Sequence, residues 1–212
     1  MFSRHELVWL TPAGWDAAPA LAPCWQREWP AIVRRAESDL GTDAGVVCLG
    51  IPLPARGRLA LVASVADVAR TAPPLALADV IGAAPPQWLA GLLALQRAAV
   101  GLDLRVYGSL AMASLTGLPY LRADSDIDLL LRPATRSQLS AGLALLEQYA
   151  QLLPLDGEIV FPSGEAVAWK EWLGAHGKRA DGADHPGARV LVKSLHALRL
   201  ADPAQLAAAL PP

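Results

Sequence analysis

One stretch, YGSLAMASLTGLPYLRADSDIDLLLRP at residues 107–133, constrains this chain more than any other. A glycine–serine step follows an apolar run, and aspartates then occur at alternate positions, at Asp124, Asp126 and Asp128. Because every second side chain of a strand points to the same face, Asp126 and Asp128 would project together. Two ionised carboxylates so close raise each other's pKa unless a positive charge compensates them. The stretch is therefore either a solvated acidic loop or half of a site with a counter-ion.

The sequence around the aspartates favours a metal ion as that counter-ion. No lysine lies near them, although Arg122 and Arg132 flank the cluster. Mg²⁺ is the simplest partner, because it prefers oxygen ligands and binds alongside substrate phosphates. Gly108 lets the backbone turn sharply, and Ser109 would lie at a helix N-terminus, where free amides favour phosphate. These features predict phosphoryl or nucleotidyl transfer, in which the protein mainly positions groups and neutralises charge.

The overall charge and hydropathy exclude other classes of protein. The chain has 212 residues with a net charge of −2, so we expect no nucleic-acid partner, which would need many cationic contacts. Mean hydropathy is +0.31, yet no apolar run reaches the roughly 18–20 residues that span a bilayer. The start, MFSRHELVWL, lacks the features of a signal peptide. We therefore expect a cytoplasmic protein with no membrane partner.

Short apolar runs and Pro/Gly turns alternate in the N-terminal part of the chain. They predict strands at Glu6–Leu10, Ala31–Arg34, Val46–Ile51 and Leu59–Ser64. Pro-Pro pairs within residues 71–86 predict a crossing between domains, with the boundary open between about residues 70 and 86. We expect an α+β protein: a small N-terminal α/β or mostly-β module over residues 1–80, which recognises substrate or carrier, and a catalytic domain over residues 81–212.

The second half alternates helix and strand patterns more regularly. A capping-box pattern at Thr135–Gln138 predicts the start of a helix that runs to about Gln151. Two further helices are expected at Pro86–Gly101 and Ser109–Leu115. The strands expected in this half are Leu104–Tyr107, Asp126–Leu131, Glu158–Phe161, Ala166–Trp169 and Arg189–Lys193.

Two levels of resemblance follow from these motifs. Gly108-Ser109 with Asp126-Ile127-Asp128 resembles the glycine–serine and DxD signature of the polymerase-β-type nucleotidyltransferase superfamily. This resemblance implies a nucleotidyltransferase-like mixed sheet flanked by helices in the catalytic domain. A closer resemblance covers almost the whole chain. The chain resembles the phosphoribosyl-dephospho-CoA transferase family of the malonate decarboxylase system in several separate segments. These are RHELVWL, the tryptophan-rich span through PAIVRR, YGSLAM, LTGLPYLRADSDIDLLL, LDGEIVFPSGEAVAWKEW and RVLVKS.

The resemblance implies a definite reaction and definite partners. The family, also called malonate decarboxylase holo-acyl-carrier-protein synthase, takes triphosphoribosyl-dephospho-CoA and joins its phosphoribosyl-dephospho-CoA group to a serine. That serine belongs to the apo acyl-carrier subunit of malonate decarboxylase, and pyrophosphate leaves. By carry-over, Asp126 and Asp128 would hold one or two Mg²⁺ ions, while Gly108 and Ser109 would cradle the triphosphate.

The superfamily usually adds a third carboxylate from a neighbouring strand. In LDGEIVF, both Asp156 and Glu158 could supply it. We favour Glu158 as the catalytic residue, because the following residues continue a strand, whereas Gly157 interrupts the chain after Asp156. The choice stays open, and Asp156 is otherwise a candidate substrate contact.

Other polar and aromatic residues have weaker claims. Lys193 is a candidate phosphate contact or a surface lysine, and Lys170 and Arg122 are weaker candidates of the same kind. We expect Asp124 to cap its turn outside the metal shell and His5 to be structural. The tryptophans, Trp169 and Trp172 among them, fit a core better than a surface that stacks on the coenzyme.

Two other functions compete with the leading hypothesis. The chain could transfer a nucleoside monophosphate from an NTP to a small molecule or protein. It could also be a non-catalytic module that binds a carrier or a nucleotide. The crowded carboxylates weigh against the second alternative, because binding alone does not need them.

Overall fold

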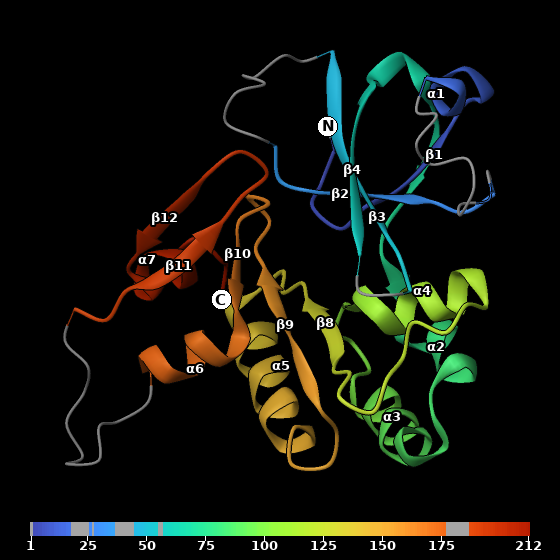
Figure 1. Cartoon of the computed structure of the whole chain (residues 1–212). Coiled ribbons are helices and arrows are strands. Elements are labelled where there is room, and N and C mark those ends of the chain that lie inside the picture. Colours follow the sequence, from blue (N-terminus) through green and yellow to red (C-terminus); the bar gives the residue numbers. More distant parts are fainter. Residues whose placement is uncertain (1, 18–25, 27, 37–44, 55–56, 177–186) are drawn as a thin grey trace.

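The structure is a computed structural model that describes residues 2–17, 26, 28–36, 45–54, 57–176 and 187–212. Within these ranges the chain forms a five-stranded sheet near the N-terminus and a larger, seven-stranded sheet with most of the helices (Figure 1). The expected α+β class is thus confirmed.

The N-terminal sheet has the strand order β4-β3-β2-β1-β5, and all its neighbours are antiparallel. Its core contains Val8, Leu49 and Ile51, each almost fully buried. Thr11 begins the short helix α1, because its hydroxyl accepts a hydrogen bond from the Gly14 amide and a proline follows it. The elements of this module are β1 (Leu7–Leu10), α1 (Pro12–Asp16), β2 (Ala31–Val33), β3 (Val46–Pro52), β4 (Arg58–Ser64), η3 (Val65–Asp67) and β5 (Val68–Ala72).

The larger sheet has the order β12-β11-β10-β9-β8-β7-β6, and only its β8–β9 pair is parallel. Parallel neighbours need a crossover, which α5 provides. The predicted cap of α5 is present: Thr135 Oγ1 accepts from the Gln138 amide, while Gln138 Oε1 accepts from the Ala134 amide, one residue earlier than expected. The strands are β6 (Leu75–Ala76), β7 (Leu104–Val106), β8 (Ile127–Leu131), β9 (Leu155–Val160), β10 (Ala166–Ala168), β11 (Val190–Lys193) and β12 (Leu198–Ala201).

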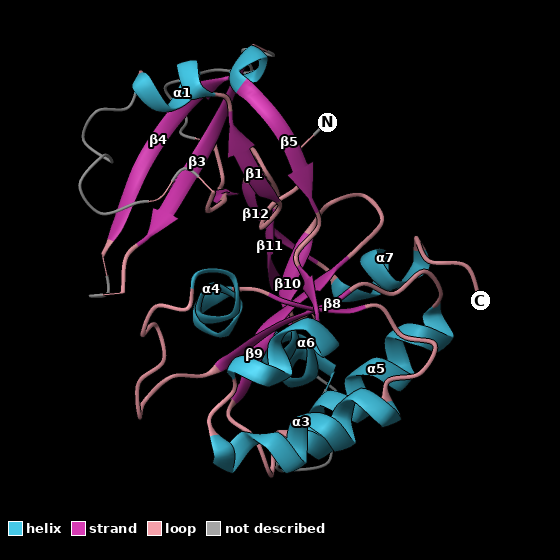
Figure 2. Cartoon of the chain, turned by 90° about the vertical axis from the view of Figure 1, so that its right-hand side faces the viewer, coloured by secondary structure: helices cyan, strands magenta, loops and turns pink. Residues whose placement is uncertain are grey.

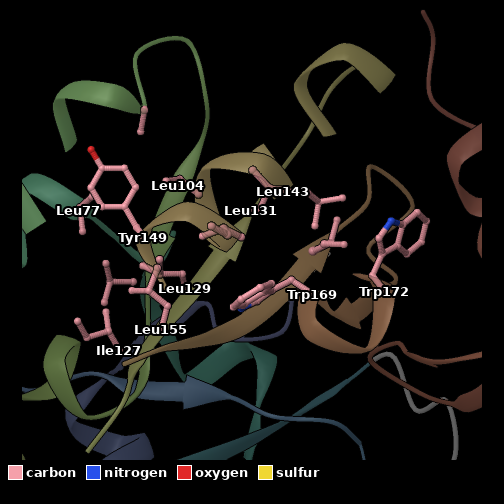
Figure 3. Close-up of a cluster of buried hydrophobic side chains, with 14 of the residues drawn as sticks. Leu77, Leu104, Ile127, Leu129, Leu131, Leu143, Tyr149, Leu155, Trp169 and Trp172 are labelled. Carbon is pink, nitrogen blue, oxygen red and sulfur yellow. The ribbon is translucent and has the colours of Figure 1, made fainter. Parts of the chain in front are cut away.

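A continuous apolar core fills the space between this sheet and its helices (Figure 3). Trp169 and Trp172 are both buried in it, which confirms the core interpretation of these tryptophans. None of the described helices has the length and apolarity that crossing a bilayer requires. The helices are α2 (Leu77–Val80), η4 (Ile81–Ala83), α3 (Pro86–Ala98), α4 (Gly108–Thr116), α5 (Arg136–Tyr149), α6 (Trp169–His176) and α7 (Pro203–Ala208).

Helix α4 lies between the two sheets (Figure 2). Its Leu110 belongs to the core of the larger sheet, whereas Met112 belongs to the core of the N-terminal module. The loop after α4 also reaches that module, because Tyr120 Oη donates to the Pro52 carbonyl at 2.9 Å. The chain passes from one sheet to the other at residues 73–74, between β5 and β6. The N-terminus of α4 is therefore held where the two modules meet.

Candidate active site

The glycine–serine step forms the turn from β7 into α4. Gly108 is the first residue of the helix and has φ +67°, a left-handed conformation that favours glycine. A Cβ at this position would overlap Asp128 Oδ2, so only glycine lets that carboxylate approach the helix start. Ser109 follows as the second helical residue. The first turn of α4 and Asp128 are thus in direct contact.

Three aspartates converge beside this turn. Asp128 on β8 pairs in register with Asp156 on β9, and Asp126 immediately precedes β8. One carboxylate oxygen from each of the three lies within 4.8 Å of the other two. Because these oxygens come from two neighbouring strands and the end of one of them, the sheet itself determines their spacing.

The aspartates have little positive charge to balance them. Burial, with the like charges of Asp126 and Asp156, raises the pKa of Asp128 to about 7. Lys170 Nζ lies 3.4 Å from Asp156 Oδ1, but both side chains are well exposed, so the pair is weak. A group of carboxylates that repel one another is a ligand set suited to a hard divalent cation such as Mg²⁺. On these grounds the residues fit the metal that the sequence predicts.

Glu158 is in a different environment from these aspartates. It lies opposite Leu130 on β8 and is only 4% exposed. Its carboxylate forms ion pairs with Arg4 at 3.1 Å and with Lys193 at 2.9 Å, and its Oε2 lies 3.3 Å from His5 Nε2. Burial alone would raise the pKa of Glu158, but the His5 hydrogen bond and the Arg4 charge outweigh it and hold the pKa well below its usual range.

The geometry therefore groups Asp156, and not Glu158, with the aspartate pair. Glu158 was favoured because Gly157 was expected to interrupt the chain after Asp156. That expectation is wrong, because β9 begins at Leu155 and runs through Gly157 without a break. Gly157 has φ +133°, and a Cβ there would overlap the Leu129 carbonyl oxygen. The glycine permits close pairing of β9 with β8 instead of interrupting the strand.

The Arg4-His5 turn of the N-terminal module closes this part of the site. His5 has φ +66°, the only positive φ among the described non-glycine residues. The centroid of its ring lies 4.1 Å from the centroid of the Tyr107 ring. Tyr107 is the residue immediately before Gly108. Burial lowers the pKa of His5 despite the nearby Glu158, so we assign a neutral imidazole whose Nε2–H donates to that carboxylate. His5 also lines the cleft described next, and its structural role stays a prediction.

A cleft of about 1200 Å³ opens between the modules in front of the aspartates. Gly108, Ser109, Asp126 and Asp128 line one side of it. The N-terminal module and the loop after α4 contribute a set of cationic residues to the other walls, namely Arg4, Arg34, Arg35, Arg58 and Arg122. Sequence reasoning missed four of these arginines, because nothing in their local spacing connects them to aspartates some seventy to a hundred and twenty residues further along the chain.

Three further residues that the sequence suggested for the site or its surroundings are Lys193, Arg122 and Asp124. Lys193 Nζ is occupied by Glu158, so its expected contact with phosphate stays a prediction. Arg122 lines the cleft and donates to the Pro54 carbonyl at 3.2 Å. Asp124 is exposed and lines the cleft, but it is outside the group of three aspartates.

The protein is therefore of the α+β class, with a group of three aspartates beside a cleft that is lined by arginines from both modules. Comparison with known proteins then identifies the family. The Phosphoribosyl-dephospho-CoA transferase MdcG C-terminal domain matches residues 76–204, and its N-terminal domain matches residues 3–74. The chain belongs to the phosphoribosyl-dephospho-CoA transferase family and is a transferase.

Relatives from several bacteria support this assignment. A phosphoribosyl-dephospho-CoA transferase of Xanthomonas campestris pv. campestris strain 8004 is 44% identical over 190 residues, 82% of this chain and 87% of that protein. One from Bradyrhizobium diazoefficiens is 36% identical, covering 94% and 89% of the two chains. One from Pseudomonas putida is 33% identical, covering 92% and 91%. No solved structure matches the chain significantly.

Proposed function

We propose that this protein transfers the phosphoribosyl-dephospho-CoA group from triphosphoribosyl-dephospho-CoA to a serine of the apo acyl-carrier subunit of malonate decarboxylase. The serine hydroxyl attacks the phosphorus atom attached to the ribose, and the bond from that phosphorus to the terminal pyrophosphate breaks. A phosphodiester forms, the hydroxyl proton is released, and pyrophosphate leaves. This is a reaction of the nucleotidyltransferase type.

The chain's own residues have separate tasks in this reaction. Asp126, Asp128 and Asp156 hold Mg²⁺, which supplies positive charge to the reacting phosphates when bound. The first turn of α4, with Ser109 and its free amides, holds phosphate oxygens by hydrogen bonds and by the helix dipole. Glu158 has no part in the chemistry, because its charge is already balanced by Arg4 and Lys193; it keeps the Arg4-His5 turn against the larger sheet.

The observation that carries the proposal is the contact between the three-aspartate group and the glycine turn. Asp126, Asp128 and Asp156 would hold a cation directly beside a helix start suited to phosphate, and the transfer of a polyphosphate-activated group requires such an arrangement. The cleft in front of them is large enough for a coenzyme-sized molecule. Membership in the phosphoribosyl-dephospho-CoA transferase family supports the choice of the group transferred.

The test is mass spectrometry of the apo-carrier after incubation with the purified protein, Mg²⁺ and triphosphoribosyl-dephospho-CoA. We expect each carrier to gain the mass of one phosphoribosyl-dephospho-CoA group, and one pyrophosphate to be released for each carrier modified. Both results should be lost with EDTA or when the carrier serine is replaced by alanine. An NTP in place of the precursor tests nucleotidyl transfer as the alternative. An unmodified carrier with every donor would overturn the proposal, and a citrate lyase carrier supplied in parallel tests the specificity for malonate decarboxylase.

A further inference from the structure

A cationic region of the cleft lies on the N-terminal sheet. Arg34 follows β2 and Arg58 begins β4, and both line the cleft with Gly50 of β3. The two side chains meet over this glycine: a Cβ on Gly50 would lie 3.2 Å from Arg58 Cδ and 3.8 Å from Arg34 Cδ. The absence of a side chain at Gly50 therefore makes room for the aliphatic part of Arg58 on the sheet.

The guanidinium of Arg58 has no partner in the described part of the protein. Its neighbour Arg34 donates from Nε to the Leu49 carbonyl at 3.1 Å, but no described carboxylate or carbonyl accepts from Arg58. Arg58 is exposed to the cleft. A cation held over the sheet by its stem, with no acceptor among the described residues, is available for an anionic ligand.

The position of Arg58 relates it to the aspartate group on the opposite side. Arg58 lines the cleft from the N-terminal sheet, whereas Asp126 and Asp128 line it from the larger sheet. Arg58 forms no ion pair with Asp128 within 4 Å. The guanidinium and these carboxylates therefore border the same cleft without neutralising each other directly.

We propose that Arg58, supported by Arg34 and Gly50, binds a pyrophosphate group of the substrate between the N-terminal sheet and the aspartate group. A guanidinium can bind two oxygens of such a group with paired hydrogen bonds. The inference rests on the proposed function for the substrate, which contains two groups of this chemistry. One is the terminal part of the triphosphate, and the other is the diphosphate within dephospho-CoA.

Isothermal titration calorimetry of the full chain in Mg²⁺ tests this site, with inorganic pyrophosphate and dephospho-CoA as separate probes. We expect Arg58→Ala to weaken the binding of one probe about tenfold or more, and Arg58→Lys to weaken it less, because lysine keeps the charge but loses the paired geometry. Gly50→Ala should weaken the same probe more mildly, since its methyl group pushes against the Arg58 stem.

Arg70→Ala is the matched control. Arg70 is an exposed arginine of the same module whose guanidinium lies 3.4 Å from the Trp9 ring centroid, and it does not line the cleft. A loss for pyrophosphate alone assigns Arg58 to the triphosphate, and a loss for dephospho-CoA alone assigns it to the coenzyme diphosphate. If both probes bind Arg58→Ala as they bind the wild type, or if neither binds the wild type, the inference is overturned.

The outcome is separable from that of the proposed function. A carrier that is modified normally while Arg58→Ala binds both probes normally would refute only the inference about Arg58. Conversely, the protein could bind a probe in a way that depends on Arg58 and yet never modify the carrier. That result would support the Arg58 site and refute the proposed reaction. Circular dichroism of each variant confirms that the folded state is retained.

Discussion

Asp156 and Glu158 are two residues apart on the same strand and face the same side of the larger sheet, yet their surroundings are opposite. Asp156 joins two other aspartates, and among the described residues only an exposed lysine, Lys170, pairs with it. Glu158 is buried among Arg4, His5 and Lys193. The difference arises because the Arg4-His5 turn of the N-terminal module lies against Glu158.

This contrast separates catalytic charge from structural charge. A carboxylate without enough cations around it is costly to keep and can be used to bind a metal ion. A buried carboxylate with several cations is satisfied, and its removal leaves those cations unpaired.

Asp156→Asn should lower the rate of carrier modification by about a hundredfold or more, because it removes one of three ligands from the metal centre. Its stability to urea should stay the same or rise slightly, since a repelling charge is lost. Rates come from pyrophosphate release. The control is Asp124→Asn, which removes the same charge from a cleft residue outside the three-aspartate group and should keep most of the activity. Equal rates for the two variants would contradict the assignment of Asp156 to the metal centre.

Glu158→Ala should instead lower the free energy of unfolding by about 3–5 kcal/mol, because the part-buried Arg4 and Lys193 would lose the counter-charge of the buried carboxylate. Urea denaturation followed by tryptophan fluorescence measures it. The control is Glu165→Ala, which breaks the more exposed pair with Arg199 and should cost about 1 kcal/mol or less. Similar losses in the two variants would show that the Glu158 cluster is not a structural centre.

Gly108→Ala should cost stability and, more strongly, activity. The left-handed backbone alone costs about 1–2 kcal/mol, and the new methyl group would displace the Asp128 carboxylate. Gly117→Ala is a matched control, since its φ is +70° but a Cβ there meets no atom within 4 Å. Both variants should lose similar stability in urea, while only Gly108→Ala loses transfer activity. A fully active Gly108→Ala would contradict the close packing of turn and carboxylate.

Metal-free protein should become more stable as the pH falls from 8 to 5, compared with Asp128→Asn. The folded pKa of Asp128, about 7, lies above its ordinary value of 3.8, so its protonated form favours folding and that contribution is lost as pH rises toward 7. We expect a difference of about 1–2 kcal/mol, allowing for solvent screening. Mg²⁺ should remove most of it. Urea curves that shift in parallel for both proteins would refute the effect.

Much of the fold and part of the site could be predicted from local sequence. Strand β8, helix α4 and the Thr135 cap of α5 lie within a few residues of their expected positions, because their signals are periodicity, a glycine turn and a capping pattern. The pairing of Asp126 with Asp128 beside Gly108 likewise follows from alternation along one strand and one sharp turn. Interactions over such short sequence distances depend little on the rest of the chain.

The other features of the site depend on contacts between segments that are far apart in the sequence. Whether Asp156 or Glu158 joins the aspartates depends on the register of β9 against β8, and a long-range pairing sets that register. Arg4 and His5 reach Glu158 across more than 150 residues of sequence. Arg58 likewise faces the site from a separate sheet. Local sequence thus sets the chemical character of the acidic centre. The docking of two modules sets which charges remain unbalanced, because compensation requires cations that only the folded chain brings within a few ångströms.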